Sequence, residues 1–196
     1  MTKPILATTE VNVLQAINLT LGTSAFLGLA DSLFRLLSPG NASVAKALLI
    51  SVLLFWAVKL LVENHRSFAS NRVISNGHYA VFQLLMTVIM FLALTTSAKN
   101  AQDLPGSAFW LSLSLCAGIV WLAVLAGSFG RDFRWRLYPW QWVGSAAVTA
   151  VGAAAISRET IQYDSSGATV WLAAMLAAGL ADAWATGTFS LTQDQA

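Results

Sequence analysis

The chain of 196 residues is 57% hydrophobic, carries only 10% charged residues and has a formal net charge of +2. A soluble domain of this length normally contains about 25% charged residues. This composition excludes an ordinary soluble domain, and long apolar runs take the place of the missing charge. The sequence therefore predicts an integral membrane protein.

Six apolar runs come close to the ~20 residues that a helix needs to cross ~30 Å of hydrocarbon. The runs are continuous rather than alternating, and backbone groups in lipid must find their partners within the segment, so each run is expected to be a helix. The spans are expected at about residues 11–37, 44–62, 78–98, 108–129, 139–156 and 169–189. Because the connections are short, we predict an all-α bundle of six transmembrane helices that forms one domain over residues 1–196.

The basic residues of the loops predict the orientation of this bundle. The second loop carries Arg66 and Arg72, and the fourth carries Arg131, Arg134 and Arg136. Loops on the cytoplasmic side of a membrane are enriched in such residues. We therefore expect both loops and both termini to be cytoplasmic, in the cytoplasmic (inner) membrane.

Two acidic residues inside the apolar runs are the best indication of function. Asp31 and Asp182 each end the tetrapeptide Gly-Leu-Ala-Asp. An ionised carboxylate in hydrocarbon costs at least a few kcal/mol, so such residues usually face the interior of a bundle or a water-filled path. The pair predicts candidate transport-path residues.

The two carboxylates have different local surroundings. Arg35 follows Asp31 by one helical turn, a favourable pairing, so a structural role and a functional role are equally good interpretations of Asp31. Asp182 has no basic residue within one turn of its own helix. It must find a partner on another helix, be protonated or face water, and we expect it to be the principal site.

The first span also carries a polar face. Gln15, Asn18 and Gly22 are spaced three and four residues apart and therefore share one side of the helix. This face either hydrogen-bonds to neighbouring helices or lines a wet cavity, so Gln15 and Asn18 join the candidate path. In the second span, Lys59 and Glu63 are expected to form a one-turn pair at the cytoplasmic boundary.

Small residues recur at four-residue spacing in the last two spans. The rows are Ala146, Ala150 and Ala154, and Ala173, Ala177, Ala181 and Ala185. Small residues allow membrane helices to approach closely. The rows favour packing within the chain, with an oligomer interface as the alternative. Six slim helices leave little room for a central pore, so a pore would favour a homo-oligomer.

The fourth loop combines basic and aromatic residues. Its candidate surface consists of Arg131, Arg134, Trp135, Arg136 and Trp140. This pattern is typical of an aromatic belt that anchors the protein in the bilayer. A surface that binds anionic lipid or a partner protein is the alternative.

Motifs for catalysis are absent from the sequence. It has no Gly-x-Ser-x-Gly, no His-Glu-x-x-His and no phosphate-binding loop. Glu63 and His65 form the one plausible acid/base pair, and they lack a nucleophile. His65 and His78 lack a third metal ligand at a recognisable spacing. We therefore expect no catalytic residue, no metal, no cofactor and no nucleic-acid partner.

The leading hypothesis is a small oligomeric membrane channel or transporter for an ion or small solute, with the intramembrane carboxylates on its path. The alternative is a non-catalytic membrane subunit or sensor. It would dock a partner protein or lipid through Glu63–Gly77 and Arg131–Trp142.

Overall fold

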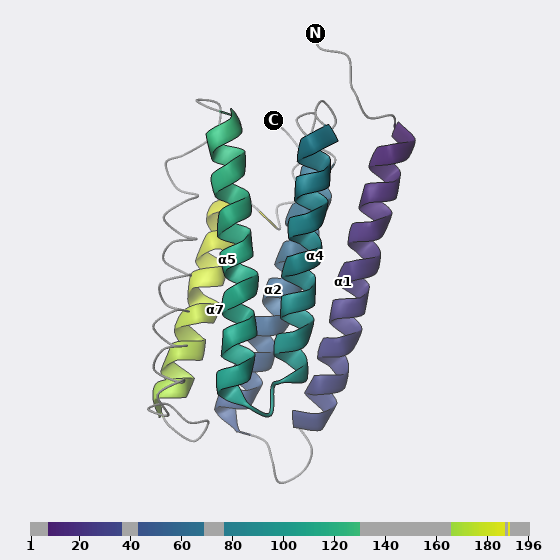
Figure 1. The fold of residues 1–196 in the computed structure, drawn as a ribbon. Helices are drawn as coiled ribbons and strands as arrows, with labels where there is room; N and C mark the ends of the chain where they lie inside the picture. Colours follow the sequence, from purple (N-terminus) through teal and green to yellow (C-terminus); the bar gives the residue numbers. More distant parts are fainter. Residues whose placement is uncertain (1–7, 37–42, 69–76, 130–165, 187, 189–196) are drawn as a thin grey trace.

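The computed structural model describes residues 8–36, 43–68, 77–129, 166–186 and 188. Every regular element in these ranges is a helix (Figure 1). The helices are α1 (Thr8–Leu36), α2 (Val44–Phe68), α4 (Gly77–Lys99), α5 (Leu104–Phe129) and α7 (Ser166–Thr186). All five are long and apolar enough to cross a membrane. The all-helical class is thereby confirmed, and the span expected at 139–156 lies outside the described residues.

Two helices extend beyond their expected bounds for identifiable reasons. α2 continues past residue 62 to Phe68, and Glu63, Asn64 and Phe68 are buried. Because these residues pack against neighbouring helices, α2 continues through a charged stretch that resembles a membrane boundary in the sequence. α5 begins at Leu104 rather than 108, because Asp103 Oδ2 accepts a hydrogen bond from the Gly106 N–H at 3.1 Å. This is the contact of a helix N-cap.

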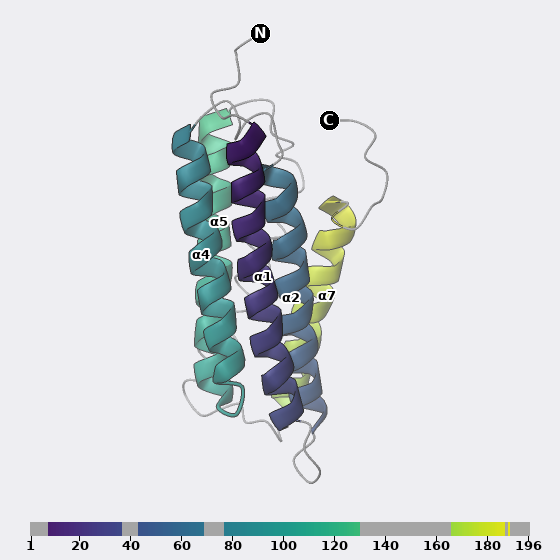
Figure 2. The same ribbon diagram turned by 90° about the vertical axis from the view of Figure 1, so that its right-hand side faces the viewer.

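α2 and α4 each pack against three of the other described helices. α2 contacts α1, α4 and α7, and α4 contacts α1, α2 and α5. Successive helices α1, α2, α4 and α5 alternate in direction, and α7 runs the same way as α2 (Figures 1 and 2). The carboxyl-terminal ends of α2 and α7 therefore lie on the same side, opposite the carboxyl-terminal end of α1.

Apolar side chains fill the space between the helices and also cover the outside. The core includes Trp56 of α2, Leu94 of α4 and Leu111 of α5. Phe34 and Trp184 are large apolar side chains that remain exposed. Helices that are apolar all round are typical of a membrane environment.

Hydrogen bonds join α4 to α5 inside this apolar packing. The Ser97 hydroxyl lies 2.7 Å from the Ser107 carbonyl oxygen and donates to it, and the Ser114 hydroxyl donates to the Met90 carbonyl oxygen at 2.9 Å. All three serines are buried. Such bonds help membrane helices associate, because the hydrophobic effect does not drive helices together within lipid.

Candidate functional site

A buried ion pair connects α2 to α7. The Lys59 ammonium lies 2.6 Å from Asp182 Oδ2, and the two side chains are 0% and 1% exposed. Asp182 Oδ2 meets the ammonium without the alignment of a hydrogen bond. Lys59 Nζ also lies 5.5 Å from the centroid of the Trp56 ring, within the range of a cation–π contact.

A second carboxylate completes the site. Glu63, one turn along α2, pairs with the same Lys59 ammonium. The Thr188 hydroxyl donates a hydrogen bond to Glu63 Oε1 at 2.8 Å. Lys59, Glu63 and Asp182 are called the buried triad below.

The buried triad has an excess of negative charge. One ammonium and two carboxylates sum to a net charge of −1. Within the described part of the chain, Asp182 Oδ1 and Glu63 Oε2 are buried and have no hydrogen-bond partner. Burying a charge is costly unless it is paired and hydrogen-bonded. Among the described residues, the triad therefore holds one more carboxylate than ammonium groups.

The face of α7 that meets α2 explains how Asp182 reaches Lys59. Leu172, Met175, Gly179 and Asp182 are buried and follow one another at three- and four-residue spacing. Gly179 permits close approach, because a Cβ there would lie 2.7 Å from Phe55 Cε1. Of the three alternatives for Asp182, the structure shows a partner on another helix.

Lys59 is the site residue whose role the sequence did not reveal. Its spacing to Glu63 predicted the local pair, which the structure confirms, but placed that pair at a boundary rather than in the interior. The available signal was that Lys59 and Asp182 both lie in the carboxyl-terminal half of their helices, and that these helices run in the same direction.

Asp31 lies apart from the buried triad. Arg35 Nε is 3.0 Å from Asp31 Oδ2, and the two side chains are 73% and 64% exposed, respectively. The local pair expected from the sequence is confirmed. Asp31 is near the carboxyl-terminal end of α1, so it lies at the opposite end of the bundle from Asp182 (Figure 1).

The polar face of α1 packs against α2. Asn18 is buried and donates a hydrogen bond from Nδ2 to the Leu61 carbonyl oxygen at 3.2 Å, while Gln15 is half-buried. One turn further, a Cβ on Gly22 would lie 2.6 Å from Leu61 Cδ1. Of the two alternatives for the polar face of α1, Asn18 therefore shows the first, a hydrogen bond to a neighbouring helix.

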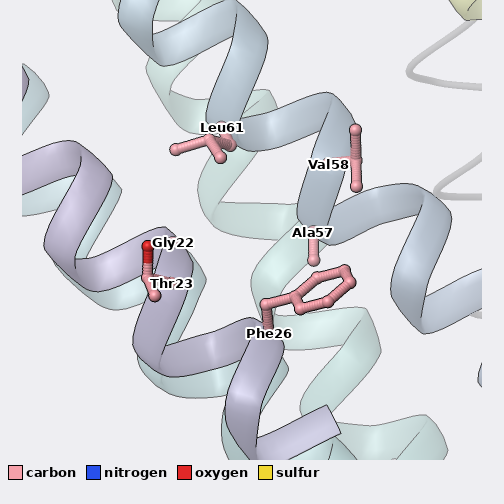
Figure 3. Close-up of a pocket in the computed structure, with 6 residues that line it drawn as sticks. All are labelled: Gly22, Thr23, Phe26, Ala57, Val58 and Leu61. Atoms are coloured by element: carbon pink, nitrogen blue, oxygen red, sulfur yellow. The ribbon is translucent and has the colours of Figure 1, made fainter. Parts of the chain in front are cut away.

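A small pocket opens beside this contact. It has a volume of about 130 Å³ and lies between α1 and α2. Gly22, Thr23 and Phe26 of α1 face Ala57, Val58 and Leu61 of α2 across it (Figure 3). Its lining is largely apolar and includes none of the candidate path residues.

A further polar layer was missed in the sequence. Gln83 of α4 is buried, accepts a hydrogen bond from the Ser67 hydroxyl at 2.8 Å and donates to the Asn64 carbonyl oxygen at 3.5 Å. The Asn64 side chain is also buried, and its Oδ1 and Nδ2 have no hydrogen-bond partner in the described ranges. The sequence feature that could have indicated this layer is Gln83, an amide within the third apolar run.

The alanine row of α7 does not pack within the described bundle. Ala173, Ala177 and Ala181 are exposed among the described helices. The span at 139–156 lies outside the described residues, so packing of this row within the chain stays a prediction. The buried small residues on this helix are Ala168, Gly179 and Ala183. The side chain of Ala185 and the row Ala146, Ala150 and Ala154 lie outside what the structure describes.

The basic and aromatic surface predicted in the fourth loop also lies outside the described residues. Its members are Arg131, Arg134, Trp135, Arg136 and Trp140. His65 and His78 are exposed. Across the five described helices, no three His, Cys, Asp or Glu side chains gather where they could hold a metal ion.

Comparisons with known proteins give no family for this chain: no protein-family model, no curated protein and no solved structure matches it. The functional argument therefore rests on the chemistry of the buried triad.

Proposed function

We propose that the chain is an integral membrane channel or transporter for an ion or small solute, and that the buried triad is its ion-responsive site. The observation that carries this proposal is Asp182, which is 1% exposed and lies 2.6 Å from the equally buried Lys59 of another helix. Ionisable residues at membrane depth characteristically mark ion and proton pathways.

The surroundings of the triad support a membrane setting. Five described helices have the length and hydropathy of membrane spans. Apolar side chains such as Phe34 and Trp184 cover the outside of the bundle, where lipid would solvate them. In the proposed topology, six spans cross the cytoplasmic membrane and both termini are cytoplasmic. The triad then lies nearer the cytoplasmic face and Asp31 nearer the opposite face.

The free-energy cost of burying the triad favours a functional role over a purely stabilising one. Removing two charges from solvent costs several kcal/mol per ion, and a buried ion pair often gives no more stability than apolar residues of the same size. Glu63 adds a second carboxylate to the same ammonium, which increases this cost. A transport site requires this chemistry, because it must bind and release a charge within the bilayer.

The proposal includes assembly into a homo-oligomer. Ala173, Ala177 and Ala181 form an exposed row of small residues on α7. Rows of this kind let helices of neighbouring subunits approach closely. Because α7 carries Asp182 on its opposite, buried side, an oligomer built through this row would place one triad in each subunit near the interface.

The test is flux through purified protein in liposomes. H⁺, Na⁺, Rb⁺ and glycerol are the probes, and Asp182→Asn is compared with Asp31→Asn, a matched control at an exposed carboxylate. We expect wild type and Asp31→Asn to pass at least one probe, and Asp182→Asn to fall to the level of protein-free liposomes. Equal flux through wild type and Asp182→Asn, or no flux of any probe through wild type, would overturn the proposal.

A further inference from the structure

We infer that the ion taken up by the buried triad is a proton, and that Asp182 rather than Glu63 carries it. This inference rests on the proposed function, because it identifies the ion to which that site responds.

The position of Lys59 selects a proton over a metal cation. Its ammonium contacts both carboxylates and so occupies the place between them where a metal ion would gain most from their charge. A metal ion would have to displace this ammonium or bind beside it against repulsion. A proton needs neither, because it bonds to a single carboxylate oxygen such as Asp182 Oδ1, which has no hydrogen-bond partner among the described residues.

The contacts of the two carboxylates select Asp182 as the carrier. Glu63 Oε1 accepts a hydrogen bond from Thr188 and also contacts the ammonium. Asp182 contacts the ammonium alone, and within the described residues neither of its oxygens has a hydrogen-bond partner. Hydrogen bonds to a carboxylate stabilise its charged form, and burial disfavours that form. Asp182 therefore offers the oxygens to which a proton can bond without loss of an existing hydrogen bond.

Within the described residues, few charged groups lie near Asp182. Among the described helices, α7 packs chiefly against α2, from which Lys59 contacts Asp182 and Glu63 shares the Lys59 ammonium. α7 itself carries no other charged side chain among residues 166–186. With one proton on Asp182, Lys59 and Glu63 balance each other and the site becomes neutral. The charge of the site is therefore controlled by one proton.

Protonation also changes the contact between the helices. A proton from water that bonds to Asp182 Oδ1 removes the charge that attracts Lys59, and the ammonium keeps its pair with Glu63 on its own helix. The ion pair between α2 and α7 is thereby lost. When water reaches Asp182 from the other side of the membrane, the proton leaves to that water and the ion pair re-forms. Proton binding and helix contact are thus coupled through one side chain.

The test is infrared spectroscopy of the wild-type protein in lipid nanodiscs, as a function of pH, in parallel with H⁺ and Na⁺ flux in liposomes. Incorporation of ¹³C-labelled aspartate shifts the carbonyl band of a protonated aspartic acid and leaves that of glutamic acid in place. We expect a buried protonated aspartate band that titrates with pH, is unchanged when Na⁺ replaces choline, and persists in Glu63→Gln.

The outcomes separate this inference from the proposed function. A missing protonated aspartate band, a band that disappears when Na⁺ is added, or a band that shifts only with labelled glutamate would overturn the assignment of a proton to Asp182. If Na⁺ flux depends on Asp182 and no such band is found, the assignment of a proton to Asp182 is overturned and the proposed function stays in place. A titrating aspartate band in a protein that passes no probe would overturn the proposed function and leave the proton site.

Discussion

Gly179 of α7 lies directly against the ring of Phe55 of α2: a Cβ on Gly179 would stand 2.7 Å from Phe55 Cε1. Asp182 follows Gly179 by three residues and therefore lies on the same side of the helix. The missing side chain at position 179 and the ion pair at position 182 are parts of one contact. The glycine sets how near α7 comes to α2, and this nearness allows Asp182 to reach Lys59.

Replacing this glycine by a large residue is expected to separate the two helices. Gly179→Leu forces a side chain into the space of Phe55 and Trp56, and overpacking of this kind costs about 1–3 kcal/mol. Ala174→Leu is the matched control, because Ala174 is exposed on the same helix and lies outside the alanine row. Reversible unfolding in mixed micelles should show a lower free energy of unfolding for Gly179→Leu only. Equal stability of both variants would show that α7 does not depend on close approach at Gly179.

Removing the ammonium of the triad should destabilise the protein strongly. Lys59→Met leaves two carboxylates in a buried site, and breaking a buried ion pair by removing one partner costs about 3–5 kcal/mol. Lys99→Met, at the exposed end of α4, is the control and should leave the free energy of unfolding unchanged.

A second substitution should recover most of this loss. Lys59→Met together with Asp182→Asn removes one charge of each sign and leaves Glu63 with its hydrogen bond from Thr188. The same unfolding measurement on the double variant yields the coupling between the two positions. Strictly additive effects of the two substitutions would contradict the ion pair.

The amide of Asn18 is expected to matter less for stability than its burial suggests. Asn18→Leu removes one hydrogen bond to Leu61, worth about 1 kcal/mol, but it also removes Oδ1, a buried acceptor without a partner in the described chain. We expect the free energy of unfolding to change by no more than about 1 kcal/mol, close to the value for Asn12→Leu at an exposed position. If flux also stays at the wild-type level, Asn18 is a structural contact and not part of the path.

The pair at the other end of the bundle should contribute little. Asp31 and Arg35 are mostly exposed, and exposed ion pairs are worth about 0–1 kcal/mol. Asp31→Asn is therefore expected to unfold within about 1 kcal/mol of wild type. A loss as large as that of Lys59→Met would contradict the difference between the two Gly-Leu-Ala-Asp segments.

The sequence predicted what depends on local spacing. Apolar length alone identified the described helices, and the intervals Asp31 to Arg35 and Lys59 to Glu63 identified two ion pairs. Helix ends were less predictable. The charged turn after residue 62 resembles a membrane boundary, but burial of Glu63 and Asn64 against neighbouring helices continues α2 to Phe68.

The contact between Lys59 and Asp182 could not be predicted in the same way. No periodicity relates two residues on helices that are far apart in the chain, so the sequence defined only that Asp182 lacked a partner on its own helix. The face of α7 was also ambiguous, because alanines occur on all its sides. Gly179 and Asp182, not the alanine row, determine which side meets α2.

The central claim is that Asp182 works in transport and does more than hold α7 to α2. Flux through the double variant, Lys59→Met with Asp182→Asn, tests it most directly, because this variant is expected to fold and yet lacks the carboxylate. We predict a double variant that is more stable than Lys59→Met, with flux at the level of protein-free liposomes. A double variant that regains both its stability and wild-type flux would contradict the account and leave the ion pair as a structural contact.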